Sequence, residues 1–346
     1  MKQRHRLIIG LVVSLLFLYL AMREIDWQEL GLVFQQANYL YLLPALPVLL
    51  AINVIRAYRW RLLIDTEVRL PLVRIFHIVN IGYFFNNVLP AKAGELVRGY
   101  LVGRMIPGGI GQALSTLLIE RLLDVLTVVA LLVMLLPVVD LPTWATRGGL
   151  LFGAAAVAGT IVLIVLSRFG RRGVDAIWRV IGRVPLIGQD RVRAAAQNLV
   201  DGFGVLTVGR LVPSIIISSA LIWLGYAIFN YILMSAFHLQ YLPFWAAALV
   251  LCATGFAMVL PSSPGAMGVF QWAAVQALAV FAVSESVAFG YSLGLQLYTN
   301  LTLIVLGLIG LTREGMSYSQ VRKQAIESAD ARTGEETADM NPAMER

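Results

Sequence analysis

The chain has 346 residues, of which 59% are hydrophobic and 14% charged, and its mean hydropathy is +0.78. This composition is typical of a polytopic membrane protein and excludes a soluble dehydrogenase, nuclease or zinc enzyme. The formal charge of +7 is explained by arginines in short loops, which set membrane orientation and meet anionic lipid. The single cysteine excludes an intrachain disulfide, and the three histidines show no metal-ligand spacing.

The first apolar run, from Leu7 to Met22, follows three basic residues and has no small-residue cleavage site after it. We interpret it as an uncleaved transmembrane helix with a cytoplasmic N-terminus. Residues 23–38 are polar and are placed outside, and a second span returns from Tyr39 to about Tyr58. The next connection is predicted to be cytoplasmic because it carries five arginines, Arg56, Arg59, Arg61, Arg69 and Arg74.

The segment from about Pro71 to Met105 is predicted to be a re-entrant broken helix. Its apolar run, Ile75 to Phe85, is too short to span, since a span needs about 20 apolar residues. Pro90 cannot continue a helix, and Gly94 lets backbone approach backbone closely. Charge on such a segment is tolerated at membrane depth only where protein or water surrounds it.

Two further spans are predicted at Gln112–Leu136 and Gly148–Leu166. They precede an insertion from Arg168 to Arg210 that holds eight arginines. Apolar residues at helical spacing predict that this insertion contains an amphipathic helix on the cytoplasmic membrane surface. Leu211–Phe237 is predicted to span outward.

A second broken helix is predicted from Leu242 to Val283. The run from Val259 to Gly265 repeats the pattern Val-Leu-Pro-x-x-x-Gly of Val88 to Gly94. Paired interrupted helices in the two halves of a membrane protein indicate a transport site. With four identities in apolar sequence, chance coincidence is the alternative explanation.

A last span, Val287–Leu311, completes an all-α polytopic membrane protein. Residues 1–311 are expected to form the integral membrane domain, with about six full transmembrane helices and two re-entrant helices arranged as an inverted repeat. Residues 312–346 are predicted to be a disordered cytoplasmic tail. This layout places both termini in the cytoplasm and the protein in the cytoplasmic membrane; eight crossings with other boundaries is the rival count.

Three charged residues, Glu120, Arg121 and Asp124, lie inside an apolar span. Each charge costs about 2.5–3.5 kcal/mol near a bilayer centre, so all three must face protein or water. Glu120 and Asp124 share one helical face, and Arg121 reaches Asp124. Two interpretations stay open. The charges are an ionic clamp to the first broken segment, or they line a polar cavity that passes a lipid head group.

The broken helices also offer places to hold a phosphate. A half-helix that starts near Gly94 directs its positive end at Lys92, and Ser263 begins a second such end. The predicted lipid phosphate-binding residues are Lys92, Gly94, Arg98, Ser263 and Gly265. The alternatives are that Lys92 snorkels to the interface, that Ser263 only caps a helix, and that Arg98 pairs with Glu95.

Three ordered motifs resemble the flippase-like membrane-protein family named for the transmembrane region of lysylphosphatidylglycerol synthase. The matching residues are Asn87, Pro90, Ala91, Lys92, Gly94, Glu95 and Arg98, then Glu120, Arg121 and Asp124, then Pro261, Ser263, Pro264, Gly265 and Gly268. Two positions depart from the family pattern, because Ala266 replaces a glycine and Gln271 replaces a glutamate. Gln271 therefore lacks the carboxylate that the family pattern has at this position.

The resemblance implies an inner-membrane protein linked to lipid translocation, although some relatives are described as membrane glycosyltransferases. Our first hypothesis is a flippase for an anionic phospholipid or a polyprenyl-phosphate-linked lipid, with a gating ion network of Glu95, Glu120, Arg121 and Asp124. The alternative is a membrane-embedded glycosyltransferase that uses a lipid-linked donor, with Glu95 or Asp124 as base. A structural scaffold is the third hypothesis.

For the flippase, no catalytic residue, cofactor, metal or nucleic acid is expected, and the chain has no Gly-Lys-Ser/Thr nucleotide loop. Membrane lipids are the expected partners. A second copy of the chain and a lipid-modifying enzyme are the protein partners that this hypothesis allows.

Overall fold

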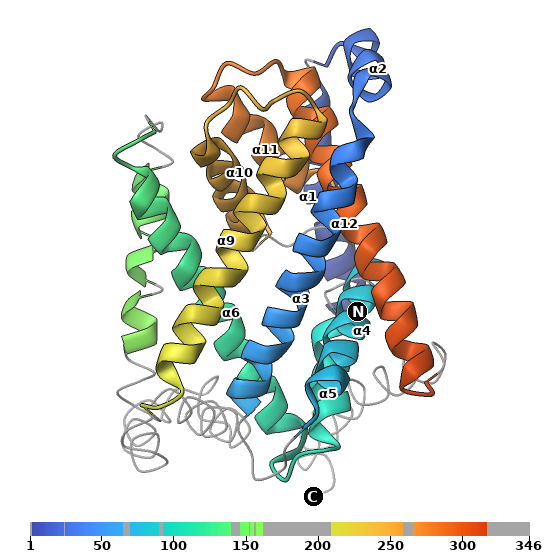
Figure 1. Ribbon diagram of the computed structural model, residues 1–346, viewed down its shortest axis with the longest axis vertical. Coiled ribbons are helices and arrows are strands. Elements are labelled where there is room, and N and C mark those ends of the chain that lie inside the picture. Colours follow the sequence, from blue (N-terminus) through green and yellow to red (C-terminus); the bar gives the residue numbers. More distant parts are fainter. Residues whose placement is uncertain are drawn as a thin grey trace, which may run out of the picture.

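The structure is a computed structural model, and every regular element in its described residues is a helix (Figure 1). The described residues are 2–23, 25–64, 70–89, 93–139, 146–151, 153–155, 157–161, 209–258 and 266–316. The predicted all-α class is confirmed. The predicted insertion at 168–210, except its last two residues, and the tail beyond 316 lie outside the described residues.

The helices follow one another along the chain. They are α1 (Lys2–Met22), α2 (Trp27–Gln36), α3 (Leu42–Ile64), α4 (Leu72–Val88), α5 (Gly94–Gly103), α6 (Gly109–Leu135), α9 (Val212–Ala236), α10 (Phe244–Ala257), α11 (Val269–Ala279) and α12 (Glu285–Arg313). The longest stretch outside the described residues that separates two of them, 162–208, lies between α6 and α9. Among the described residues, three helices are long and apolar enough to cross a membrane: Tyr39–Ile64, which includes a short 3-10 turn, Val212–Ala236 and Glu285–Arg313. The 27-residue α6 is equally long but carries three charges near its middle.

Helix α3 continues well beyond the predicted end at Tyr58. The prediction that Arg56, Arg59 and Arg61 lie in a loop between elements was therefore wrong. Arg59 is fully buried and Arg56 nearly so. Two arginines can lie inside an apolar helix here because the carboxylates of α6 face them.

The two interrupted segments form two helix pairs, α4 with α5 and α10 with α11, whose members pack on each other. In Figure 1 the first pair occupies the lower half of the molecule and the second pair the upper half. A Cβ added at Gly94 would overlap the carbonyl oxygen of Gly82, so glycine permits the close approach of α4 and α5. The breaks at Pro90 and at 259–265 lie outside the described residues. That both pairs re-enter the membrane stays a prediction.

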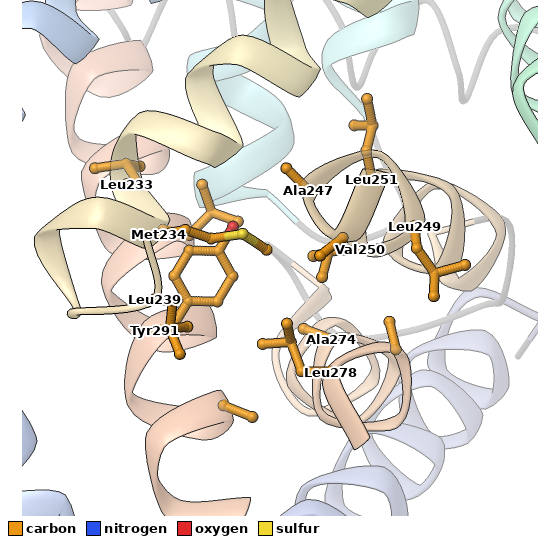
Figure 2. Close-up of a cluster of buried hydrophobic side chains, with 14 of the residues drawn as sticks. Leu233, Met234, Leu239, Ala247, Leu249, Val250, Leu251, Ala274, Leu278 and Tyr291 are labelled. Atoms are coloured by element: carbon orange, nitrogen blue, oxygen red, sulfur yellow. The ribbon is translucent and has the colours of Figure 1, made fainter. Parts of the chain in front are cut away.

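Two hydrophobic cores hold the helices together. The first, shown in Figure 2, joins α9, α10, α11 and α12 through side chains such as Met234, Val250, Leu278 and Tyr291. The second joins the lower part of α3 to α4, α5 and α6. The buried charges of α3, α5 and α6 are packed against this second core.

Candidate functional site

The site is centred on Glu120 and Asp124 of α6. Glu120 is fully buried and lies about 16 Å along the helix from Gly109, at about 1.5 Å per residue. Its Oε2 accepts a hydrogen bond of 2.7 Å from Arg98 Nη2 of α5. Asp124, one turn later on the same face, accepts a 2.6 Å hydrogen bond at Oδ1 from Arg59 Nη2. The two carboxylates of α6 thus form ion pairs with α5 and with α3.

Arg56 of α3 lies between these two carboxylates. Its Nη1 is 3.4 Å from Glu120 Oε1 and 3.3 Å from Asp124 Oδ2. Arg59 Nη1 also donates to Ser219 Oγ of α9 at 3.0 Å, which brings a fourth helix to the cluster. Neither arginine was predicted from the sequence to be a site residue. Their spacing of three places them on one face of a helix, and this was the signal that could have found them.

Helices α5 and α6 are joined by a second ion pair nearer the surface. Arg121 Nε is 2.8 Å from Glu95 Oε1, and the two side chains are 38% and 31% exposed. Arg121 Nη1 also lies 3.4 Å from Asp124 Oδ2, as predicted from their spacing. The ion-paired partner of Arg98 is Glu120 and not Glu95. The structure therefore contains ion pairs between α6 and α5 of the kind that the clamp interpretation requires.

Aromatic rings cover the faces of the buried guanidinium groups. The Cζ atom of Arg98 is 4.2 Å from the centre of the Trp60 ring. The ring of Tyr83 is 5.9 Å from the Cζ atoms of both Arg98 and Arg56, and Tyr226 is 5.6 Å from Arg56. Such stacking stabilises a desolvated cation but leaves the in-plane N–H groups of the guanidinium available.

The cluster carries more positive than negative charge. Among the described residues, four guanidinium groups (Arg56, Arg59, Arg98 and Arg121) meet three carboxylates (Glu95, Glu120 and Asp124). The surplus of one positive charge lies in the fully or nearly buried part of the cluster. Four buried guanidinium N–H atoms, Arg56 Nε, Arg59 Nε, Arg98 Nε and Arg98 Nη1, have no hydrogen-bond partner in the described structure. A buried charge without compensation is costly, so the arrangement favours an added anion.

The remaining predicted residues are only partly placed. Lys92, Pro90, Pro261, Ser263, Pro264 and Gly265 lie outside the described residues. The Gly94 N–H donates to Asn86 Oδ1 at 2.9 Å, so this helix end is capped by a residue that the sequence analysis passed over. Asn87 donates to the Tyr83 carbonyl within α4. Its contact stabilises the end of that helix.

Comparison with known proteins places the chain in a family. The family model described as the lysylphosphatidylglycerol synthase TM region matches residues 7–307. The chain belongs to this family. All seven charged residues of the cluster lie inside the matched region.

A curated relative is the UPF0104 membrane protein MJ1595 of Methanocaldococcus jannaschii, 31% identical over 117 residues. The alignment covers 33% of this chain and 35% of that protein. No solved structure shows a significant match. Family membership and the apolar helices together establish a multi-pass membrane protein.

In this member of the lysylphosphatidylglycerol synthase TM family, Gln271 has a structural role that a neutral side chain serves. Its Oε1 accepts from the Gly268 N–H at 2.7 Å, and its Nε2 donates to Gln296 Oε1 of α12 at 2.5 Å. Gly268 has φ +88 and lies against the backbone of α1 at Ser14. Gln271 therefore caps α11 and ties it to α12.

Proposed function

We propose that this chain translocates an anionic phospholipid or a polyprenyl-phosphate-linked lipid across the cytoplasmic membrane. The observation that carries the proposal is the buried cluster of α3, α5 and α6 with its surplus positive charge. A phosphate entering a bilayer needs its charge compensated. The unpartnered guanidinium N–H groups supply both the charge and the donors.

Arg98 is suited to bind a phosphate while it keeps its ion pair with Glu120. One of its nitrogens, Nη2, is bonded to Glu120, while Nε and Nη1 have no partner in the described residues. Nε–H and Nη1–H point from different edges of the planar guanidinium, so each can donate a charge-assisted hydrogen bond to a phosphate oxygen. We further propose Lys92, Ser263 and Gly265 as phosphate ligands, together with Gly94 once its N–H leaves Asn86 Oδ1.

The Glu95–Arg121 pair is proposed as the gate. Solvent-exposed ion pairs contribute about 0–1 kcal/mol, whereas breaking a buried pair costs about 3–5 kcal/mol, and this pair is the more exposed of the two that join α5 to α6. Separation of α5 from α6 therefore begins at Glu95 and Arg121 and leaves the Arg98–Glu120 pair in place. Such an opening would admit a head group to the buried N–H donors.

The glycosyltransferase alternative requires a carboxylate that is free to act as base. Its two candidates, Glu95 and Asp124, are both ion-paired to arginines, which supports transport over sugar transfer. Turnover of a lipid-linked sugar by the purified chain would decide for the alternative.

Reconstituted vesicles test the proposal directly. Purified chain in liposomes that contain a fluorescent anionic phospholipid is expected to expose inner-leaflet lipid to an external quencher faster than protein-free liposomes. Equal quenching rates with and without protein would refute translocation.

The proposed orientation has its own test in a Cys252→Ser background. Single cysteines at Arg183 and Ser328 are expected to react only from the cytoplasmic side, and one at Gln28 only from outside. External labelling at Arg183 would overturn the layout with both termini in the cytoplasm.

A further inference from the structure

We infer that the translocated head group is a phosphodiester that carries hydroxyl groups and no ammonium group. Its binding path runs from Arg98 on α5 past Arg56 to Trp223 on α9. The inference deepens the proposed function and rests on it, because it names the class of lipid that the same cluster selects.

Unpartnered polar atoms mark the path. In the part of the chain that the structure describes, eight buried side-chain atoms have no hydrogen-bond partner. Asn53 and Arg98 are fully buried. Leaving so many buried polar groups unbonded would rival the stability of a whole fold. These atoms must therefore bond to water or to a ligand, and both need a polar route into the bundle.

Four of the residues that carry these atoms, Arg98, Tyr83, Arg56 and Trp223, follow one another in space. Tyr83 of α4 lies between Arg98 and Arg56, 5.9 Å from each, and its hydroxyl is unpartnered. Arg56 lies over Tyr226 at 5.6 Å, and the Tyr226 ring is 6.3 Å from the Trp223 ring. The path thus crosses from the first helix pair to α9.

Two further contacts extend the path. The Trp223 ring is 3.5 Å from where a Cβ would stand on Gly255 of α10, a member of the second helix pair. Asn53 is one turn from Arg56 on α3, and its Nδ2 donates to Leu49 O while its Oδ1 has no partner. The path therefore connects the α4–α5 pair to the α10–α11 pair. The side-chain amide of Asn53 lies beside it.

The chemistry of these atoms selects the ligand. Of the six unpartnered atoms on residues of this path, four are N–H donors of arginine or tryptophan, one is a hydroxyl that can donate or accept, and one is an amide oxygen. A phosphodiester supplies acceptors for the N–H groups. Asn53 Oδ1 needs a donor, and a hydroxyl on the head group supplies one without adding charge.

An ammonium head group meets two obstacles. The cluster already has a surplus positive charge, which repels a second cation. The Trp60, Tyr83 and Tyr226 rings, which could otherwise bind an ammonium, already face the guanidinium groups of Arg98 and Arg56. The head group is therefore glycerol- or sugar-like and neutral beyond its phosphate.

Binding of short-chain lipids to the purified full chain in detergent tests this selection. The probes are dihexanoyl phosphatidylglycerol, dihexanoyl phosphatidylmethanol, which lacks hydroxyls, and dihexanoyl phosphatidylcholine. Affinities come from the rise of the thermal midpoint with lipid concentration. We expect phosphatidylglycerol to bind about fivefold tighter than phosphatidylmethanol, and phosphatidylcholine to bind at least about tenfold weaker than either.

Matched variants assign the effect to the path. Asn53→Leu should make phosphatidylglycerol and phosphatidylmethanol equal, while both stay tighter than phosphatidylcholine. Trp223→Phe, which keeps an aromatic side chain but removes the indole N–H, should weaken binding of both anionic lipids alike. The control is Asn230→Leu, because the Asn230 Oδ1 already accepts from the Tyr291 hydroxyl at 3.0 Å. It should leave the ratio of affinities unchanged.

Two results would overturn the inference: phosphatidylcholine binding as tightly as phosphatidylglycerol, or Asn53→Leu retaining the wild-type ratio. If Asn53→Leu does not fold, an unchanged affinity in Trp223→Phe overturns the path. Failure of the proposed function looks different. If the proposed function is wrong, the lipid preference is present in detergent but vesicles show no translocation.

Discussion

Arg98 and Glu120 form the closest ion pair between α5 and α6. The surplus positive charge of the cluster predicts that loss of Arg98 destabilises the protein less than loss of Glu120. In Arg98→Gln, Glu120 keeps Arg56 at 3.4 Å and Arg59 at 3.8 Å, and the cluster becomes neutral. This loss of a charged hydrogen bond should lower the free energy of unfolding by about 1.5–3 kcal/mol. In Glu120→Gln, three buried arginines lose a shared carboxylate and the surplus rises to two. That change should cost about 3–5 kcal/mol.

Reversible unfolding in mixed micelles measures both differences. The double variant Arg98→Gln/Glu120→Gln completes a cycle, in which contacting charges should couple by about 0.5–3 kcal/mol. Arg98→Lys keeps the charge but loses planar stacking on Trp60, so it should be less stable than the wild type. If Arg98→Gln is as destabilising as Glu120→Gln, the surplus charge does not determine how the cluster contributes to the free energy of unfolding.

In the same Arg98→Gln variant, the proposed phosphate site predicts a transport defect larger than its stability loss explains. Loss of about 1.4 kcal/mol of phosphate binding slows translocation about tenfold where binding is limiting. Vesicles assayed well below the unfolding midpoint separate the two effects. Wild-type translocation by this variant would remove Arg98 from the lipid path.

Three more substitutions test separate parts of the site. Lys92→Gln should also slow translocation of an anionic lipid about tenfold in the vesicle assay, and an unchanged rate excludes Lys92 as a phosphate ligand. Glu95→Gln should change the free energy of unfolding by no more than about 1 kcal/mol yet speed translocation, because it weakens the gate; a slower rate contradicts that role. Gly94→Ala should destabilise by about 1–3 kcal/mol, because its Cβ overlaps the Gly82 carbonyl. The control Gly31→Ala, with open space around it, should be neutral or stabilising.

Several features of this protein follow from the sequence alone. An apolar composition with helical breakers leaves helices as the structure for most of the chain, because unpaired backbone groups are too costly in lipid. Glu120 and Asp124 had to be paired, since an isolated charge in an apolar span is expensive. The contact of Arg121 with Asp124 was predictable because it depends only on local helical spacing.

The partners of the buried charges were decided by the tertiary structure. Arg56 and Arg59 look like loop arginines in the sequence, and only the packing of α3 on α6 brings them to Glu120 and Asp124. Arg98 has a carboxylate three residues away, but α5 packs so that Glu120, distant in sequence, meets it instead. Which charges pair between helices depends on the rotation and register of the packed helices. Those are set by side-chain packing across the whole bundle, which spacing along one helix does not encode.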